Sequence, residues 1–197
     1  MAVVILAAGR SSRMGRPKLL LPWADRTIVE HLIQQWLTVG AAQIAVVVAA
    51  HNTRLIDEVQ KIGRAFCIVN PEPDRGMFSS VRCAAEWPHW HPTLTHWVMS
   101  LGDQPHLQDT TLRKLTGAVQ SEPQLVWQPA YRGRRHPVVL PKNSFTALRD
   151  TAASNLKTFL ESSSVARKSI DIDDPGLEID IDTPEDYGRA KKLAGLE

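Results

Sequence analysis

The stretch LAAGRSSRMGRPK, residues 6–18, is the richest in residues that could do chemistry. Small apolar residues run into a turn that holds Gly9, Gly15 and four cations. Glycines let the backbone turn tightly and present N–H groups to an anion, and Arg13 and Lys18 add side-chain charge. The spacing is not that of a P-loop, and GxGxxG is absent. The pattern predicts an anion-binding loop, and the alternative interpretation is a basic turn that only solubilises the sheet edge.

A second candidate is SLGDQP, residues 100–105, where Asp103 directly follows an apolar run. Gly102 precedes this carboxylate and Pro105 fixes the exit of the chain. Hard divalent cations prefer such oxygen ligands, and Mg²⁺ typically takes one or two carboxylates together with substrate phosphates. The alternative is that Asp103 only caps the following helix.

A third candidate is EIDIDTPEDY, residues 178–187. The alternation IDID predicts that Asp180 and Asp182 point to the same side and face a cleft, so that Ile179 and Ile181 can be buried on the other side. If Asp182 lies near Asp103, the pair could hold Mg²⁺ opposite the cations of the first loop. Alternatively, Asp182 or Thr183 simply caps the last helix.

The elements that must position these residues alternate between strand-like and helix-like runs. Short apolar runs predict buried parallel strands at residues 3–8, 44–50, 65–69, 95–101 and 124–130. Helical spacing and capping signals predict helices at residues 27–40, 53–61, 79–86, 109–120 and 183–193. This alternation predicts a three-layer α/β/α sandwich around a mostly parallel sheet. Ligands of such sheets bind beyond the carboxyl ends of the strands, which is where the first two candidates lie.

Length and composition limit the remaining possibilities. A chain of 197 residues with 43% apolar residues fits a single domain, residues 1–197. Its 23 basic and 21 acidic residues leave a net charge of only +2, so no general attraction to nucleic acid is expected. No apolar run reaches the roughly 20 residues that span a bilayer, and the start lacks a basic leader region, so we expect a cytoplasmic protein without a membrane partner. Cys67 and Cys83 lack metal-ligand spacing and are expected to be buried thiols.

The charges are nevertheless uneven along the chain. Cations gather in residues 10–18 and again at Arg132, Arg134, Arg135 and His136, whereas residues 169–188 hold eight acids and no base. A local field is therefore more plausible than a global one.

The stretch EWPHWHPTLTHW, residues 86–97, has histidines that alternate with tryptophans. A metal site at His89, His91 and His96 would need supporting cysteines or an HExxH spacing, and neither is present, so a surface loop is favoured. The tryptophans could instead form a contact surface for a partner.

Together the three candidate motifs resemble those of the MobA-like nucleotidyltransferases. NPEPDRGMFSSV, residues 70–81, and YRGRRHPVVL, residues 131–140, resemble two further segments of that family, so the likeness runs from Val3 to about Leu193. The Ala-Ala-Gly of the first motif is similar to the molybdenum cofactor cytidylyltransferases, whereas guanylyltransferases usually carry Ala-Gly-Gly there. The resemblance implies a Rossmann-like sheet of the nucleotide-diphospho-sugar transferase type, CTP as the nucleotide and Mg²⁺ as the cofactor.

The resemblance also implies roles for individual residues. Lys18, Arg13 and Asp103 would be the catalytic groups. Nucleotide-binding residues would be Leu6, Ala7, Ala8 and Gly9 beside the base, Arg13 and Lys18 on the triphosphate, and Gly76 and Ser80 on the base and ribose side. Asp103 and Asp182 would ligate the metal, and Arg135, His136, Pro137 and Asp180 would face the acceptor.

The implied reaction needs no covalent nucleophile. An acceptor phosphate, that of molybdopterin, attacks the α-phosphorus of CTP and pyrophosphate leaves. A molybdenum hydroxylase is the implied protein partner. One departure concerns Arg135, because the family usually has glycine before the His-Pro pair. Two rival functions are nucleotidyl transfer to a sugar phosphate or another small acceptor, and non-catalytic carriage of the molybdenum cofactor.

Overall fold

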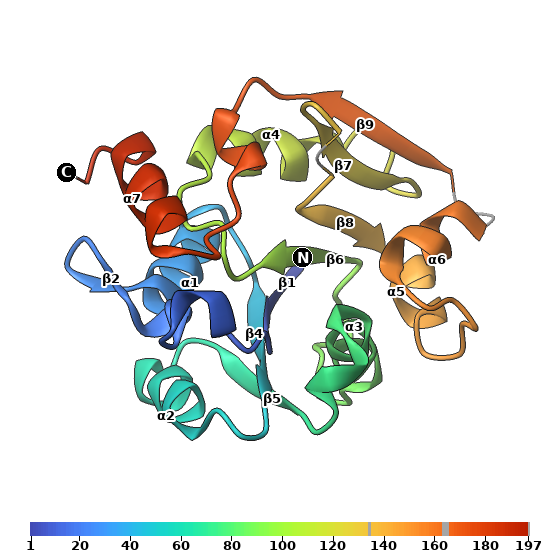
Figure 1. The fold of residues 1–197 in the computed structure, drawn as a ribbon. Coiled ribbons are helices and arrows are strands. Elements are labelled where there is room, and N and C mark those ends of the chain that lie inside the picture. Colours follow the sequence, from blue (N-terminus) through green and yellow to red (C-terminus); the bar gives the residue numbers. More distant parts are fainter. Residues whose placement is uncertain (134, 163–165, 197) are drawn as a thin grey trace.

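A central sheet carries the first two candidate motifs at the carboxyl ends of two of its strands. The computed structural model describes residues 1–133, 135–162 and 166–196. In these residues the sheet has seven strands in the order β5-β4-β1-β6-β8-β7-β9 (Figure 1). The strands are β1 Ala2–Ala7, β4 Gln43–Ala49, β5 Phe66–Asn70, β6 His96–Leu101, β7 Val126–Ala130, β8 Val138–Pro141 and β9 Arg167–Asp171. Two short strands, β2 Pro22–Trp23 and β3 Arg26–Thr27, pair separately.

The five strands predicted from apolar runs all form and all point the same way. β1 pairs in parallel with β4 and with β6, and β4 pairs in parallel with β5. β8 is antiparallel to both β6 and β7, so β7 points in the same direction as β1. The mostly parallel sheet predicted from the sequence is therefore confirmed, with β8 as the reversed strand.

Strands β8 and β9 were not predicted, and each has a physical reason. β8 spans four residues and ends in a proline, so it is too short for a periodicity signal. β9 has the sequence RKSID at the sheet edge, and most of its residues are exposed. Its polar composition lacks the apolar run that predicts a buried strand.

Helices cover both faces of the sheet. They are α1 Ile28–Thr38, α2 Thr53–Ile62, α3 Met77–Glu86, α4 Asp109–Ala118, α5 Lys142–Ala147, α6 Leu156–Ser162 and α7 Pro184–Leu193. The five predicted helices are present, with ends that differ by a few residues, and α5 and α6 were missed because they are short. Thr27 caps α1 by accepting a hydrogen bond from the Glu30 N–H at 3.3 Å.

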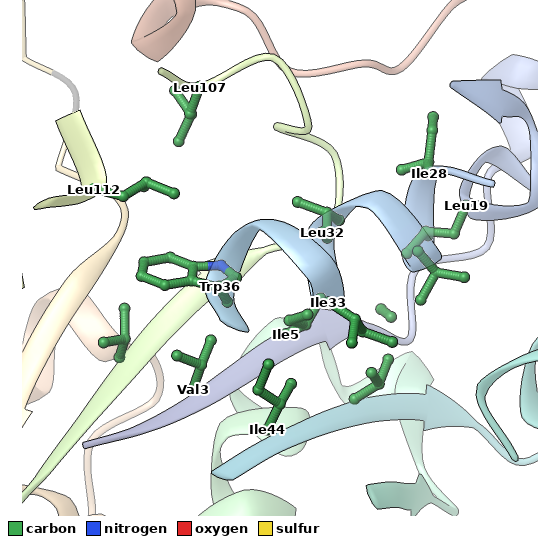
Figure 2. Packing of buried hydrophobic residues seen from close by; sticks show 14 of the residues in the cluster. Val3, Ile5, Leu19, Ile28, Leu32, Ile33, Trp36, Ile44, Leu107 and Leu112 are labelled. Carbon is green, nitrogen blue, oxygen red and sulfur yellow. The ribbon is translucent and has the colours of Figure 1, made fainter. Parts of the chain in front are cut away.

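Alternate residues of β1 pack in two separate hydrophobic cores on opposite faces of the sheet. Val3 and Ile5 pack in the core under α1, α2, α4 and α7, whereas Val4 and Leu6 pack in the core under α3, α5 and α6. Figure 2 shows the indole of Trp36, on α1, among buried aliphatic side chains that include Val3 of β1 and Leu112 of α4. The two cores confirm the three-layer sandwich.

The aromatic stretch that leads into β6 is buried at Trp97 and partly exposed at Trp87 and Trp90. Trp97 stacks on Phe145 with ring centroids 4.4 Å apart, and Trp90 donates a hydrogen bond to the Ala84 carbonyl at 2.8 Å. The histidines have separate partners, because His96 Nε2 lies 2.7 Å from the Pro123 carbonyl and His91 Nδ1 lies 2.8 Å from Thr93 Oγ1. Residues 88–95 form a loop, as predicted.

The thiols differ from expectation, since Cys67 and Cys83 are half-buried instead of fully buried. Cys67 lies on β5, which is the outermost strand of the sheet on its side, and an edge strand leaves part of its side chains accessible. In the described part of the chain no helix is long and apolar enough to cross a bilayer.

Candidate active site

Two cations and two carboxylates from three distant parts of the chain meet at the carboxyl edge of the sheet. Lys18 Nζ donates to Asp103 Oδ2 at 2.8 Å and to Asp182 Oδ1 at 3.2 Å. Arg13 Nη2 donates to the other oxygen of Asp182 at 2.7 Å. We call these four residues the charged cluster. The Lys18 side chain is 11% exposed, whereas that of Arg13 is 70% exposed.

Local backbone geometry positions Lys18 and Asp103. Lys18 begins the 3₁₀ helix Lys18–Leu20, whose Leu19 is buried in the core. The N–H of Gly102 donates to the Leu6 carbonyl at 3.1 Å, and a Cβ at residue 102 would lie only 2.9 Å from that oxygen. Only glycine lets the end of β6 approach the end of β1 this closely, and the approach places Asp103 beside Lys18.

Asp182 reaches the charged cluster through its buried neighbour. Ile181 is fully buried and its N–H donates to the Asp103 carbonyl at 3.1 Å. Residues 179–182 are not part of a strand. Asp182 is therefore positioned without hydrogen bonding to the sheet.

Neither carboxylate of the charged cluster caps a helix. Thr183 Oγ1 accepts from the Asp186 N–H at 3.2 Å, and Asp186 in turn accepts from the Thr183 N–H, which completes a capping box at α7. The Thr183 hydroxyl also donates to the Asp186 carboxylate at 2.8 Å, and this bond, together with the Thr183 N–H, lowers the pKa of Asp186 below its usual range. At α4 the Gln108 N–H donates to Asp174, not to Asp103. The capping alternative is therefore wrong for Asp103 and Asp182 and correct for Thr183.

A cavity of about 270 Å³ opens beside the charged cluster, and we call it the strand-end cavity. Its lining combines main chain at the end of β1 with the start of α3. Seven of the eight residues expected to bind nucleotide line it, and Asp103 lines it as well: Leu6, Ala7, Ala8, Gly9, Lys18, Gly76 and Ser80. Arg13 lies outside this lining and reaches the site through Asp182.

Asn70 organises one wall of the strand-end cavity, although it was not singled out as a site residue. Its side chain is fully buried and its Nδ2 donates to Ser79 Oγ at 2.8 Å and to Ser80 Oγ at 2.9 Å. Its Oδ1 accepts from the Glu72 N–H at 2.9 Å. The signal available in the sequence was an amide at the end of a strand, directly before a proline.

A second, larger cavity of about 750 Å³ lies between the β7–β8–β9 part of the sheet and α6, and we call it the α6 cavity. Arg135 and His136 line it, and Met77 lines both cavities, so the two adjoin. Pro137 is buried and is not part of the lining. Asp180 is also absent from the lining, and it accepts from Gln104 Nε2 at 3.0 Å.

The α6 cavity contains polar residues that the sequence did not reveal. Lys157 and Glu161 come from α6, and Arg167 and Ser169 come from β9. These residues were missed because neither element was predicted. Arg134 of the expected basic segment lies outside the described residues.

His136 lines the α6 cavity as a neutral side chain. Burial lowers its pKa, and a hydrogen bond to the Met99 backbone only partly opposes that effect. Its Nδ1 atom is buried without a hydrogen-bond partner in the described structure. His136 is therefore better suited to hydrogen bonding a ligand than to neutralising its charge.

Comparison with known proteins decides the family. Residues 3–168 match the family model described as MobA-like NTP transferase domain. The protein belongs to this family. It is accordingly a nucleotidyltransferase by family, and the likeness inferred from its motifs is confirmed.

Three relatives show how far the MobA-like likeness extends. The chain is 30% identical to nicotine blue oxidoreductase of Paenarthrobacter nicotinovorans, with 94% of each chain covered. It is 29% identical to the molybdenum cofactor cytidylyltransferase of Escherichia coli K12, over 96% of this chain and 94% of that protein. A nucleotidyl transferase structure from Methanothermobacter thermautotrophicus superposes with a TM-score of 0.80 at 21% identity, covering 100% and 98% of the two chains. The last similarity confirms the fold.

The charged cluster of this MobA-like chain fits a divalent metal in its donor set. Two carboxylates converge on one point, occupied here by Lys18 Nζ, and Asp103 Oδ1 is buried without a hydrogen-bond partner in the described structure. Within residues 1–133, 135–162 and 166–196, no group of three or more His, Cys, Asp or Glu side chains forms a metal site. A pair of carboxylates is the protein share that Mg²⁺ usually takes when phosphates supply further oxygens.

Proposed function

We propose that this protein transfers CMP from CTP to the phosphate of molybdopterin and releases pyrophosphate. The observation that carries the proposal is the meeting of the strand-end cavity with the charged cluster, because Lys18 and Asp103 belong to both. A nucleoside in this cavity would have its phosphates beside two cations and two carboxylates. The likeness to a molybdenum cofactor cytidylyltransferase over 96% of the chain supports the choice of nucleotide and acceptor.

The residues would divide the work by position. Main-chain groups of Leu6 to Gly9 border the base, and Ser80, held by Asn70, lines the ribose side. The Ala-Ala-Gly sequence at the end of β1 favours CTP over GTP within the family. Lys18 and Arg13 stabilise the negative charge of the triphosphate.

The chemical step is an in-line displacement at phosphorus. An oxygen of the acceptor phosphate bonds to the α-phosphorus of CTP, and the bond from that phosphorus to the pyrophosphate oxygen breaks. The protein contributes position and charge and forms no covalent intermediate. Mg²⁺ held by Asp103 and Asp182 would add positive charge beside the phosphates.

The acceptor would bind in the α6 cavity. This cavity adjoins the strand-end cavity at Met77, and its volume of about 750 Å³ suits a ligand larger than a simple phosphate ester. Arg135, Lys157 and Arg167 add three cations to its lining against the single acid Glu161. An anionic acceptor therefore suits it better than a neutral one.

Expectations about organisation and setting belong to the same proposal. Residues 1–197 would form one catalytic domain that works in the cytoplasm, and a molybdenum hydroxylase would receive the product.

A second candidate comes from the 30% identical oxidoreductase. A redox activity on nicotine blue would use the same fold, but it gives no evident role to two paired carboxylates and two cations at a strand end. Reduction of nicotine blue by NADH or NADPH tests this candidate directly.

The deciding experiment measures pyrophosphate release with CTP, GTP, UTP and ATP, each with and without molybdopterin, and separately with sugar 1-phosphates. Release with CTP that depends on molybdopterin supports the proposal. Release only with a sugar phosphate identifies another acceptor. Tight molybdopterin binding without pyrophosphate release identifies a carrier, and both results contradict the proposal.

A further inference from the structure

The four groups of the charged cluster neutralise one another in the structure. Two cations, Arg13 and Lys18, pair with two carboxylates, Asp103 and Asp182, across 2.7 to 3.2 Å. The cations are the groups assigned above to the triphosphate, and the carboxylates are those assigned to the metal. The groups assigned to the triphosphate are therefore paired with the groups assigned to the metal.

Lys18 is the more firmly held of the two cations. Its side chain is 11% exposed and its Nζ touches one oxygen of each carboxylate. Arg13 is 70% exposed and touches only Asp182. A pair at low exposure is weakly screened by solvent, so the Lys18 contacts are stronger than those of a surface ion pair.

A divalent cation and the Lys18 ammonium compete for the point between Asp103 and Asp182. Both are positive, and both need the oxygens that face the point between Asp103 and Asp182. Nothing else in the described structure competes for Asp103 Oδ2, and only Arg13 shares the Asp182 carboxylate with Lys18. A metal ion at that point would therefore displace Lys18 from Asp103 Oδ2 and Asp182 Oδ1.

We propose that Lys18 blocks the Asp103–Asp182 pair against divalent metal until a nucleotide triphosphate draws its ammonium group away. The inference rests on the proposed function, because it takes the carboxylate pair as the metal site. Lys18 also lines the strand-end cavity, so a triphosphate there lies within reach of the same side chain. Nucleotide and metal then favour each other's binding, and this coupling is reciprocal.

The first test measures metal binding without nucleotide. Mn²⁺ is titrated into the full chain and free Mn²⁺ is followed by electron paramagnetic resonance, for the wild type, Lys18→Met and Lys114→Met. Methionine keeps the length of the Lys18 side chain and removes its charge. Lys114 is an exposed lysine on α4 that donates to the Asp171 carbonyl at 2.9 Å, and it serves as the matched control.

Lys18→Met should bind Mn²⁺ at least tenfold more tightly than the wild type, and Lys114→Met should match the wild type. Adding Asp103→Asn to Lys18→Met should abolish the gain. Equal Mn²⁺ affinity in the wild type and in Lys18→Met overturns the proposal that Lys18 blocks the site. In that case, a loss of Mn²⁺ binding in Asp103→Asn would still support the metal site. No binding by any variant overturns both the block and the metal part of the proposed function.

A second measurement uses the wild type, so that it does not depend on a variant that folds. Reductive methylation followed by peptide mass spectrometry reports the accessibility of each lysine amine. Lys18 should be protected without metal and should become at least several-fold more reactive at saturating Mg²⁺, with Lys114 unchanged. Unchanged reactivity of Lys18 at a Mg²⁺ concentration that saturates the protein overturns the proposal.

Discussion

The buried amide of Asn70 donates a hydrogen bond to Ser80 Oγ across 2.9 Å and thereby connects the end of β5 to the wall of the strand-end cavity. Asn70→Ala should raise the KM for the nucleotide about tenfold, because Ser79, Ser80 and the Glu72 N–H lose the partner that positions them. It should also lower the free energy of unfolding by about 1–3 kcal/mol, since buried polar groups are left unpaired. Steady-state kinetics and urea unfolding measure the two effects.

Asn52→Ala provides the matched control for Asn70. Asn52 caps α2 by accepting from the Leu55 N–H at 3.4 Å and does not line the strand-end cavity. It should cost about 1 kcal/mol of stability with an unchanged KM. The same KM in both variants would show that Asn70 has only a structural role.

Lys18→Ala should lower kcat by about a thousandfold, because a positioned cation stabilises charge that develops in the transition state. The partly buried carboxylates also lose their partner, so the unfolding midpoint should fall, with the secondary structure measured by circular dichroism unchanged. Pyrophosphate release is the activity measured, and Lys114→Ala is the control. Near-normal turnover would remove Lys18 from the catalytic groups.

Asp103→Asn should lower kcat at least a hundredfold and raise the Mg²⁺ concentration needed for half-maximal activity. The amide keeps the shape of the side chain and loses the charge that a hard cation requires. Asp109→Asn, in the first turn of α4, is a control of the same chemistry away from the cavity. Full activity of the wild type in EDTA would contradict the carboxylate-pair model.

Arg135→Gly should raise the KM of the acceptor and leave that of CTP nearly unchanged. Arg135 lines the α6 cavity and not the strand-end cavity, and its guanidinium suits bidentate contact with a phosphate. Both constants are measured in one series of assays. An unchanged acceptor constant would mean that Arg135 points into solvent and that the departure from the family glycine has no role in binding.

His106 should make the protein less stable in mild acid. Its Nε2 lies 2.9 Å from the Gly176 carbonyl, its Nδ1 is buried without a partner in the described structure, and burial lowers its pKa. The unfolded chain therefore gains a proton at about pH 6.5 while the folded chain does not. The free energy of unfolding should fall below that pH by about 1.4 kcal/mol per pH unit for each such histidine, until the folded pKa is reached.

Thermal unfolding between pH 8 and pH 5 checks this dependence. His106→Gln should reduce the slope below pH 6.5, whereas His51→Gln, at an exposed position, should leave it unchanged. His31 and His136, whose pKa values burial also lowers, would supply the remaining slope. A wild-type stability that does not change between pH 6.5 and pH 5 would contradict the account.

Much of the site could be predicted because Lys18 and Asp103 follow strands that end at the same sheet edge. Apolar runs identified β1 and β6, and the rule for parallel sheets brought their carboxyl ends together. The direct pairing of Lys18 with both carboxylates could not be predicted, because spacing along the chain does not show which charges pair with one another.

The α6 cavity, where we propose that the acceptor binds, was less predictable because much of its polar lining comes from α6 and β9. Arg167 and Ser169 lie on β9, whose polar edge sequence carries no signal for a buried strand. Arg135 was expected to face the acceptor, but only the resemblance to the family gave it that role. The α6 cavity around it became visible only when those two elements were placed.

The reversed direction of β8 makes the segment between β7 and β8 suitable for exchange between related proteins. Because β7 and β8 are antiparallel, the chain leaves β7 at residues 131–133 and returns to β8 through residues 135–137 on the same side of the sheet. A segment anchored in this way can change in length and sequence without shifting the register of either strand. Grafting the corresponding segment between relatives would therefore be a route to new acceptor preferences on an unaltered nucleotide half, and the same freedom is available to natural divergence.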